Sequence, residues 1–472
     1  MQNHCNILLY DSRVTLLDFT DEVIFVNIRN FRIMKKLIVF SFLALLLFTG
    51  VDCKDEPPIV PPVNPLSLAV EDVTCTEVFL TLSLAGTETN RTVSMKRGDS
   101  IIATISIGET DSLFIDEGLL PKQTYTYSLV KDNWSASIQA TTQDTTSHDI
   151  QWQLPDTLGA MGLIRDVWVF SRNNAWAVGE IYLRDSNGII DNGTRYNAAQ
   201  WNGTKWEVQQ LKVNFRGNII TPPINGIFAF SQNDIWLSSG VPIHGNGETW
   251  TQYHLFDMGV LSSNDGSINK LWGAKSNNLF FVGNKGSIVR YSNGNWSKME
   301  SHTTVDLQDI WGIDESHIWA TGTNVSDGRC VVLQYDGKQW TTIYDNANKP
   351  PNEFFGFRTL WTDRTDNIYL AGGSRTQLMY LNTKIFQQQN ISAEWVALQI
   401  RGRNRRDIFE ARDGSEITHF NGVDWHRYTE IKTLNSGYAT FACVYPIQDF
   451  LLIGGFYFTG LNGLPVVIRG YR

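Results

Sequence analysis

The sequence predicts an all-β protein, with a small sandwich over residues 66–143 followed by a seven-bladed β-propeller over residues 149–472. Three observations predict this fold class. Short apolar stretches separated by turn residues recur along the chain after residue 65. From about residue 150 onward a unit of about 45 residues repeats, which is typical of propeller blades. Of the 16 tryptophans, all but Trp134 lie in this repeated part.

The composition excludes several classes of protein. With 42% hydrophobic and 18% charged residues, the chain is neither collagen-like nor a disordered polymer. Its net charge of −9 argues against a protein that binds nucleic acid, which needs a basic surface. We therefore expect a globular protein without a nucleic-acid partner, and we expect it to be a monomer.

The first element is a signal segment at residues 34–53. An apolar run, Leu37–Phe48, follows a basic start at Met34 and precedes Cys53, and it is too short to span a bilayer. We interpret residues 1–33 as a translated upstream stretch. The segment resembles a bacterial lipoprotein signal, which implies lipidation of Cys53. The alternative is an ordinary secretory signal cut nearby.

Residues 54–65 form the next element, a tether. The residues Cys53-Lys54-Asp55-Glu56, with which the mature chain of a lipoprotein would begin here, resemble the export tag of surface lipoproteins in Bacteroidetes-type bacteria. Residues 57–65 hold five of the 14 prolines, and such a run is stiff and extended. We expect a protein at the outer membrane or cell surface that contacts the membrane through its lipid only, or otherwise a secreted one.

The sandwich follows over residues 66–143, with seven short alternating stretches in about 80 residues. The segment from Leu119 to Tyr127 resembles the Leu-x-Pro-x-Thr-x-Tyr turn of fibronectin type III domains. The resemblance implies that Tyr125 is the corner tyrosine, with its hydroxyl bonded back to the backbone of the turn. It implies a spacer or adhesion module and no chemistry.

The propeller is predicted from the repeated unit. Each copy has a turn former such as Asn-Asp before its second strand, and the clearest copies have Asp-Gly or Asn-Gly before the fourth. The second strands are marked by one aromatic each: Trp176, Trp236, Phe280, Trp319, Tyr369, Phe409 and Phe450. A periodic tryptophan at a fixed strand position is first of all packing between blades. The last copy lacks a fourth strand, so we expect residues 149–154 to complete it by pairing with residues 465–471.

The repeats resemble the tryptophan-rich propellers of bacterial secreted and surface lipoproteins. Many members have no assigned activity, and some are labelled glucosyltransferase-like. The resemblance implies a fold and leaves the function open.

Residues that enter the innermost strands are the first candidates for a site. Arg165, Asp166, Lys270, Asp309 and Arg358 should face the mouth of the channel, where a propeller usually binds its ligand. If the protein is an enzyme, Asp166 and Asp309 are the candidate acid and base of a glycosidase, whose separation the sequence does not give.

A second candidate is the run from Arg401 to Arg406, which holds four arginines and is expected on a turn. It is either a solvated loop or, through Arg403 and Arg405, a site for a carboxylate or sulfate. No metal-ligand cluster, cofactor motif or nucleophile elbow is present, so we expect no cofactor and no metal, with calcium at Asp185–Asp191 left open.

Two functions follow from these observations. The first is a surface lipoprotein that acts as a non-catalytic binding or scaffold module for a glycan or protein partner, through the propeller face. The alternative is a carbohydrate-active enzyme, a hydrolase or a glucosyltransferase-like protein, that uses carboxylates at the channel mouth.

Overall fold

The computed structural model describes residues 8–10, 13–17 and 23–26, and residues 63–472 except 87–89, 109–110, 350–355, 374, 392, 432–438 and 460–461. The chain divides into two units, Met1–Val63 and Asn64–Arg472. In the first unit, β1 (Leu8–Tyr10), β2 (Arg13–Leu17) and β3 (Val23–Val26) form a small antiparallel sheet. The signal segment 34–53 with Cys53, and the tether up to residue 62, lie outside the described residues. No helix in the described part of the chain is apolar and long enough to cross a membrane.

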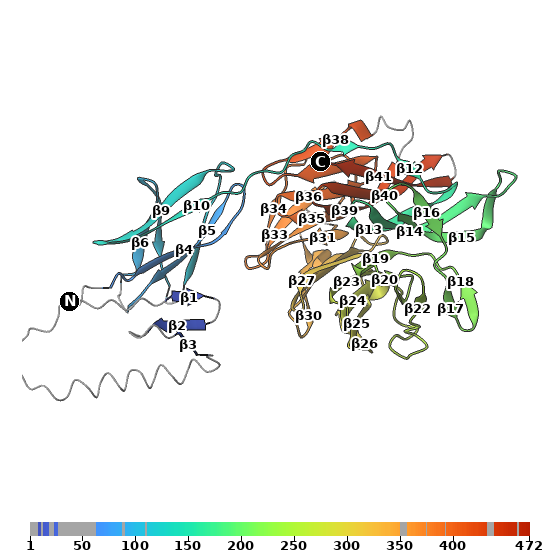
Figure 1. Ribbon diagram of the computed structural model, residues 1–472, viewed down its shortest axis with the longest axis horizontal. Coiled ribbons are helices and arrows are strands. Elements are labelled where there is room, and N and C mark those ends of the chain that lie inside the picture. The colour runs from blue at the N-terminus through green and yellow to red at the C-terminus, as the bar shows by residue number, and fades with distance from the viewer. Residues whose placement is uncertain are drawn as a thin grey trace, which may run out of the picture. The chain divides into compact units, whose positions relative to one another are not determined.

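Residues 66–141 form two antiparallel sheets that share one core (Figure 1). The first sheet consists of β4 (Leu66–Val73), β5 (Val78–Leu84) and β8 (Ser112–Asp116). The second consists of β10 (Trp134–Thr141), β9 (Thr124–Lys131), β6 (Thr92–Arg97) and β7 (Ser100–Ser106), in that order. Alternate residues such as Leu80 and Leu82 of one sheet pack with Met95 and Leu129 of the other, as strands with a side-chain period of two require. The Tyr125 hydroxyl accepts a hydrogen bond from the backbone N–H of Leu120 at 3.0 Å.

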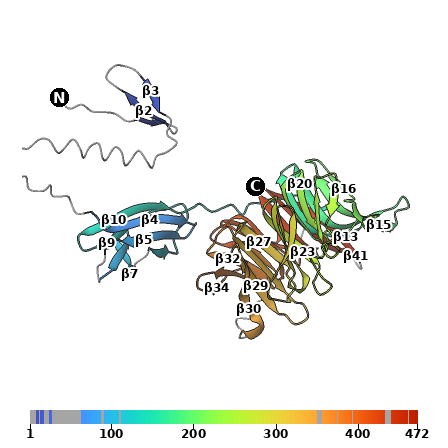
Figure 2. The same cartoon turned by 90° about the horizontal axis from the view of Figure 1, so that it is seen from below.

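Residues 161–471 form successive antiparallel sheets in which each strand pairs with the next (Figures 1 and 2). The first three sheets are β13 (Met161–Ser171), β14 (Asn174–Arg184), β15 (Ile190–Trp201) and β16 (Trp206–Gln209); β19 (Gly226–Ser231), β20 (Asp234–Ser238), β21 (Pro242–Gly245) and β22 (Trp250–Gln252); and β23 (Ile268–Lys275), β24 (Asn278–Gly283), β25 (Ile288–Ser292) and β26 (Asn295–Met299). A hairpin of β17 (Val213–Phe215) and β18 (Asn218–Ile220) lies between the first two sheets in the chain, which lengthens the first repeat. A short 3₁₀ turn, η1 (Asn284–Gly286), follows β24.

The next three sheets have the same four-stranded form. They are β27 (Asp309–Asp314), β28 (His317–Thr323), β29 (Cys330–Tyr335) and β30 (Trp340–Asp345); β31 (Thr359–Trp361), β32 (Asn367–Gly372), β33 (Arg375–Tyr380) and β34 (Ile385–Gln388); and β35 (Ala397–Asn404), β36 (Asp407–Arg412), β37 (Glu416–Phe420) and β38 (Trp425–Tyr428). The 3₁₀ turn η2 (Asn346–Asn348) follows β30.

The last sheet joins the two ends of the repeated region. It contains β39 (Ala439–Ile447), β40 (Phe450–Thr459) and β41 (Asn462–Tyr471), and its outer strand is β11 (Gln151–Trp152), which comes from before the first sheet. Gln151 lies opposite Tyr471 and Trp152 opposite Gly470, and β12 (Asp156–Thr157) extends the pairing along β41. Figure 2 shows the red β41 beside the green β13. This sheet therefore holds both ends of the array together without a free outer edge on β41.

The first strands of the sheets form a closed ring. Each contacts the first strand of the next sheet, and β39 contacts β13, so that the sheets surround a common centre as in a β-propeller. Glycines at the ends of second strands let the beginning of the first strand of the same sheet approach closely. At Gly322, for example, a Cβ atom would overlap the carbonyl oxygen of Asp306.

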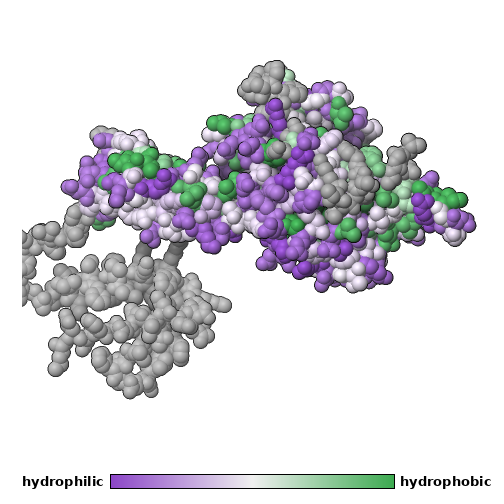
Figure 3. All heavy atoms as spheres, turned by 90° about the horizontal axis from the view of Figure 1, so that it is seen from above, coloured by the Kyte–Doolittle hydropathy of each residue, from purple (hydrophilic) through white to green (hydrophobic). Residues whose placement is uncertain are grey.

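Tryptophans fill the space between neighbouring sheets. Trp176, Trp319 and Trp361 are at most 2% exposed and belong to apolar clusters that combine two adjacent sheets. Trp272 packs where Gly312 of the next sheet leaves room, since a Cβ at that glycine would lie 2.8 Å from the indole ring. The face shown in Figure 3 is mainly hydrophilic, with apolar residues in small separate groups. Aromatic residues at the repeated strand positions thus pack in the interior.

Candidate functional site

Two buried carboxylates lie at the centre of the ring. Asp309 is the first residue of β27 and is 2% exposed, whereas Asp166 lies within β13 and is 6% exposed. Both residues lie on the first strands of their sheets, and the sequence repeat predicts that side chains at these positions face the channel. A buried carboxylate needs compensating charge and hydrogen bonds, and both have them.

Asp309 is held by groups from the next two sheets. Arg401 of β35 forms a two-point ion pair with it, with Nη1 2.9 Å from Oδ2 and Nη2 2.7 Å from Oδ1. The Thr359 hydroxyl donates to Oδ2 at 2.6 Å, and the backbone N–H of Leu360 donates to the same oxygen at 3.1 Å. The Arg401 guanidinium also lies over the Trp311 ring, 5.0 Å from its centroid. Asp309 therefore joins the fourth, fifth and sixth sheets.

Asp166 plays the same part for the other sheets. Lys270 of β23 places its Nζ 2.8 Å from Oδ2, and the backbone N–H of Ile227 in β19 donates to that oxygen at 3.0 Å. Gln399 of β35 donates to Oδ1 at 3.3 Å, and its own Oε1 accepts from the N–H of Val444 in β39 at 2.7 Å. The two carboxylates together thus connect the first strands of all the sheets in the ring.

The ion pair sets the protonation state of Asp309. Burial by itself would raise its pKa, but the charge of Arg401 and the hydrogen bonds it donates, with Lys270 nearby, hold the pKa below its usual value. Asp309 is therefore a carboxylate at neutral pH, already occupied by an internal cation.

A cavity of about 300 Å³ lies beside Asp309, which is one of its lining residues. Its wall contains at least one residue that lies in, or directly before, the first strand of each sheet of the ring. Its lining includes Arg165, Asn225, Lys270, Gln308, Arg358, Gln399 and Ala442. A concave site with a few converging polar groups is the usual form of a binding site.

Some polar atoms of this wall have no partner. Among the described residues, the exposed Arg358 guanidinium makes no hydrogen bond or ion pair, and Nε of Arg165 and Oε1 of Gln308 are buried without a hydrogen bond. The Nη2 atom of Arg165 lies 3.3 Å from Glu180, which Arg195 also contacts at 3.1 Å. Desolvation by the surrounding strands lowers the pKa of Arg358, as expected for an unpaired cation, while Asp413 acts in the opposite direction.

The run from Arg401 to Arg406 differs from the sequence expectation. Its first four residues belong to β35, so most of it is strand and only the end is a turn. Arg405 pairs with Asp72 at 2.7 Å, and Arg406 donates to the carbonyl oxygen of Asp144 at 2.8 Å. Arg403 and Arg405 are absent from the described lining of the channel cavity and have internal partners.

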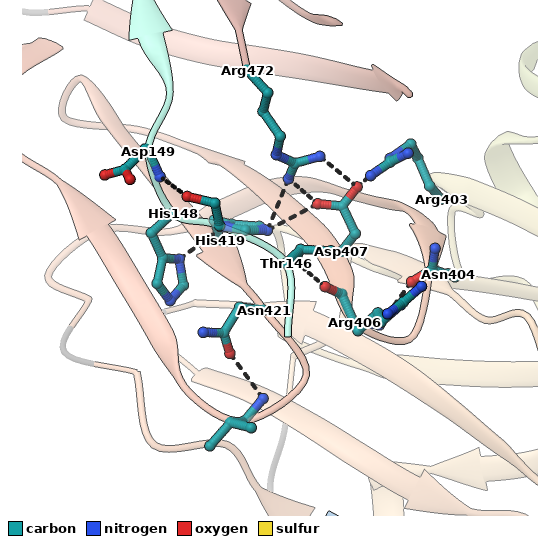
Figure 4. A network of polar contacts seen from close by, with 12 residues as sticks. Thr146, His148, Asp149, Arg403, Asn404, Arg406, Asp407, His419, Asn421 and Arg472 are labelled. Atoms are coloured by element: carbon teal, nitrogen blue, oxygen red, sulfur yellow. Dashed lines mark hydrogen bonds and ion pairs between the residues drawn. The ribbon is translucent and has the colours of Figure 1, made fainter. Parts of the chain in front are cut away.

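Arg403 belongs to a polar network that holds the two ends of the repeated region (Figure 4). Asp407 of β36 pairs with Arg403, with the C-terminal Arg472 and with Nε2 of His419, the last at 2.9 Å. The other nitrogen of His419 lies 2.8 Å from Nδ1 of His148. This network fixes the segment before β11 and the chain end on the sixth sheet, which is a structural role.

Sequence reasoning singled out five residues at the innermost strands, of which Arg165, Lys270, Asp309 and Arg358 line the cavity, whereas Asp166 is absent from its described lining. It missed Asn225, Gln308 and Gln399, and it did not foresee Arg401 as the partner of Asp309. The repeat phase could have found the three lining residues, since they lie at or just before the first strands, as the four do. No group of His, Cys, Asp or Glu that could hold a metal exists among the described residues, the loop at Asp185–Asp191 included.

Comparison with known proteins finds no matching family model and no matching curated protein. Among solved structures, YCF48 bound to D1 peptide aligns over 68% of this chain and 94% of its own, at 14% identity and a TM-score of 0.48. The WD40 β-propeller domain of Doa1 aligns over 69% and 97%, at 12% identity and a TM-score of 0.46. The extracellular domain of BT4673 from B. thetaiotaomicron aligns over 67% and 40%, at 11% identity and a TM-score of 0.44. At these values the likeness lies in the arrangement of strands, and no ligand is transferred from it.

Proposed function

We propose that this protein is a non-catalytic binding or scaffold module that meets a protein or glycan partner at the mouth of its central channel. The observation that carries the proposal is a cavity lined from all around the ring, with the unpaired Arg358 in its wall and with Asp309 and Lys270, which are both already paired, in the same wall. The exposed Arg358 is available to a ligand, whereas Asp166 and Asp309 are already paired with cations of the protein itself.

The rival function is a carbohydrate-active enzyme that uses Asp166 and Asp309. A glycosidase of either stereochemistry needs one carboxylic acid that is protonated at working pH, and hence a raised pKa. Asp309 has a lowered pKa and is shielded by Arg401, and Asp166 is engaged by Lys270 and Gln399. These contacts favour the binding function.

The domain assignments belong to the same proposal. A seven-bladed propeller is supported by the closed ring of first strands and by β11 as the outer strand of the last sheet. A fibronectin type III-like module is supported by the strand order of the two small sheets and by the hydrogen bond to Tyr125. We further propose secretion through residues 34–53 and a lipid anchor on Cys53 at the cell surface. A mass spectrum of the mature protein with an unmodified N-terminus away from Cys53 would refute the anchor.

The test is a binding screen on arrays of glycans and peptides, combined with an activity screen on the ligands that bind. We expect binding without turnover. Arg358→Gln should weaken the binding about tenfold, whereas Lys338→Gln, on an exposed turn between β29 and β30, should leave it intact. Turnover that Asp166→Asn or Asp309→Asn abolishes would refute the proposal and establish the enzyme.

A further inference from the structure

The channel mouth has more positive charge than its internal partners neutralise. Arg401 and Lys270 are matched by Asp309 and Asp166. Arg165 must share Glu180 with Arg195, and Arg358 has no ion pair among the described residues. The excess lies in a concave site, where low-dielectric walls strengthen the local field.

The unpaired atoms of the wall call for a ligand of a particular kind. The guanidinium of Arg358 and Nε of Arg165 are donors, which suit a carboxylate or another planar anion. Oε1 of Gln308 is a buried acceptor without a hydrogen bond among the described residues, and an N–H or O–H of a ligand would satisfy it. A group that carries a carboxylate and an adjacent N–H satisfies both requirements.

The remainder of the wall favours a peptide over a sugar. Leu163, Leu398 and Ala442 line the cavity and are half-buried, so they can cover an aliphatic chain. No aromatic side chain is among the described lining residues, and a sugar ring therefore finds no flat face on which to stack. The second-strand tryptophans Trp176 and Trp319, with Trp361 of a first strand, are buried between the sheets.

We propose that the channel cavity binds the carboxylate of an acidic peptide segment, with Arg358 and Arg165 as its donors and Gln308 accepting from a peptide N–H. The inference deepens the proposed function and rests on it. Because the whole chain carries a net charge of −9, unspecific attraction of an acidic peptide is weak, and binding reports on the cavity.

The experiment uses the full chain and three probes measured by fluorescence anisotropy: labelled hexaglutamate, its neutral counterpart hexaglutamine, and an acidic glycan, hexagalacturonate. We expect hexaglutamate to bind, and hexaglutamine and hexagalacturonate to bind at least tenfold more weakly. Arg358→Gln should weaken hexaglutamate about tenfold, which corresponds to about 1.4 kcal/mol. Lys338→Gln removes the same charge from a remote turn and should change the affinity less than twofold.

Each other outcome overturns the inference. Equal binding of hexaglutamate and hexaglutamine would show that the site does not distinguish charged from neutral side chains. An equal loss of affinity in Arg358→Gln and Lys338→Gln would show unspecific attraction. Hexagalacturonate bound as tightly as hexaglutamate would make the site one for acidic glycans. If no acidic probe binds while a neutral array ligand depends on Arg358, this inference fails and the proposed function stands. Array ligands that are insensitive to Arg358→Gln would defeat both. Arg358 is exposed and unpaired, so its variant should fold normally, and an unchanged thermal midpoint checks this.

Discussion

Removal of Arg401 should destabilise the ring more than any exposed substitution, because it leaves Asp309 buried without its cation. Asp309 is 2% exposed and Arg401 is 7% exposed, and two short contacts join them. Loss of one partner from such a pair typically costs about 3–5 kcal/mol. The hydrogen bonds from Thr359 and Leu360 remain, whereas the stacking of Arg401 on Trp311 is lost. We therefore expect Arg401→Leu to lower the free energy of unfolding by about 4 kcal/mol at pH 7.5.

The pH dependence gives this prediction its sharpest form. In the native protein the pKa of Asp309 is depressed, so its contribution is complete above the pKa of an unfolded aspartate and is lost only in strong acid. Without Arg401, burial is opposed only by Lys270 and by the remaining hydrogen bonds from Thr359 and Leu360, so the pKa of Asp309 rises. Protonation of Asp309 then removes the buried charge and stabilises the variant. The deficit of Arg401→Leu should consequently shrink as the pH falls from 7.5 to 5, while the native protein changes little from this group.

The assay is urea unfolding followed by tryptophan fluorescence, which reports the ring because Trp134 alone lies before residue 150. Arg216→Leu is the matched control, since Arg216 and Asp257 form an ion pair with 63% and 41% exposed side chains, and little change is expected. The double variant Asp309→Asn/Arg401→Leu should recover part of the loss. A deficit below about 1 kcal/mol, or one that is independent of pH, would refute the reasoning.

Three further predictions concern other buried groups. Trp319→Ala should cost about 3–5 kcal/mol in urea unfolding, since the indole is fully buried between two sheets; a loss typical of a surface site would contradict this. Burial, opposed by Asp407, lowers the pKa of His419 to about 4, so the unfolded state binds the extra proton and stability should fall by up to about 3 kcal/mol between pH 6.5 and 4. His419→Gln should reduce this dependence of stability on pH, and an unchanged dependence would show that another group causes it. Burial raises the pKa of Cys330 to about 11 and also raises that of Cys443, so neither thiol should react with iodoacetamide at pH 8 until the protein unfolds, as mass spectrometry will show.

Much of the fold follows from local patterns. The seven stretches expected in the sandwich lie on β4 to β10, and each aromatic that marks a second strand lies on such a strand, from Trp176 on β14 to Phe450 on β40. Strand period and turn chemistry are properties of neighbouring residues, so a sequence displays them directly. The run at Arg401 was misjudged because a cluster of arginines suggests an exposed turn, whereas β35 carries its first residue into the centre of the ring.

The sequence alone determined the repeat, the strands within each unit and the first-strand positions that face the channel, because these depend on short-range periodicity. Only the tertiary structure decided which charged side chains are paired within the protein and which remain unpaired. Arg401 reaches Asp309 across 92 positions of the chain, and Lys270 reaches Asp166 from another sheet, because ring closure brings the first strands together. Arg358 directly precedes the first strand of the fifth sheet and has no ion pair with a carboxylate among the described residues. Which side chains pair at the centre depends on which ones the closed ring places within reach of each other. The unpaired donors of the cavity could therefore be identified only from the tertiary structure.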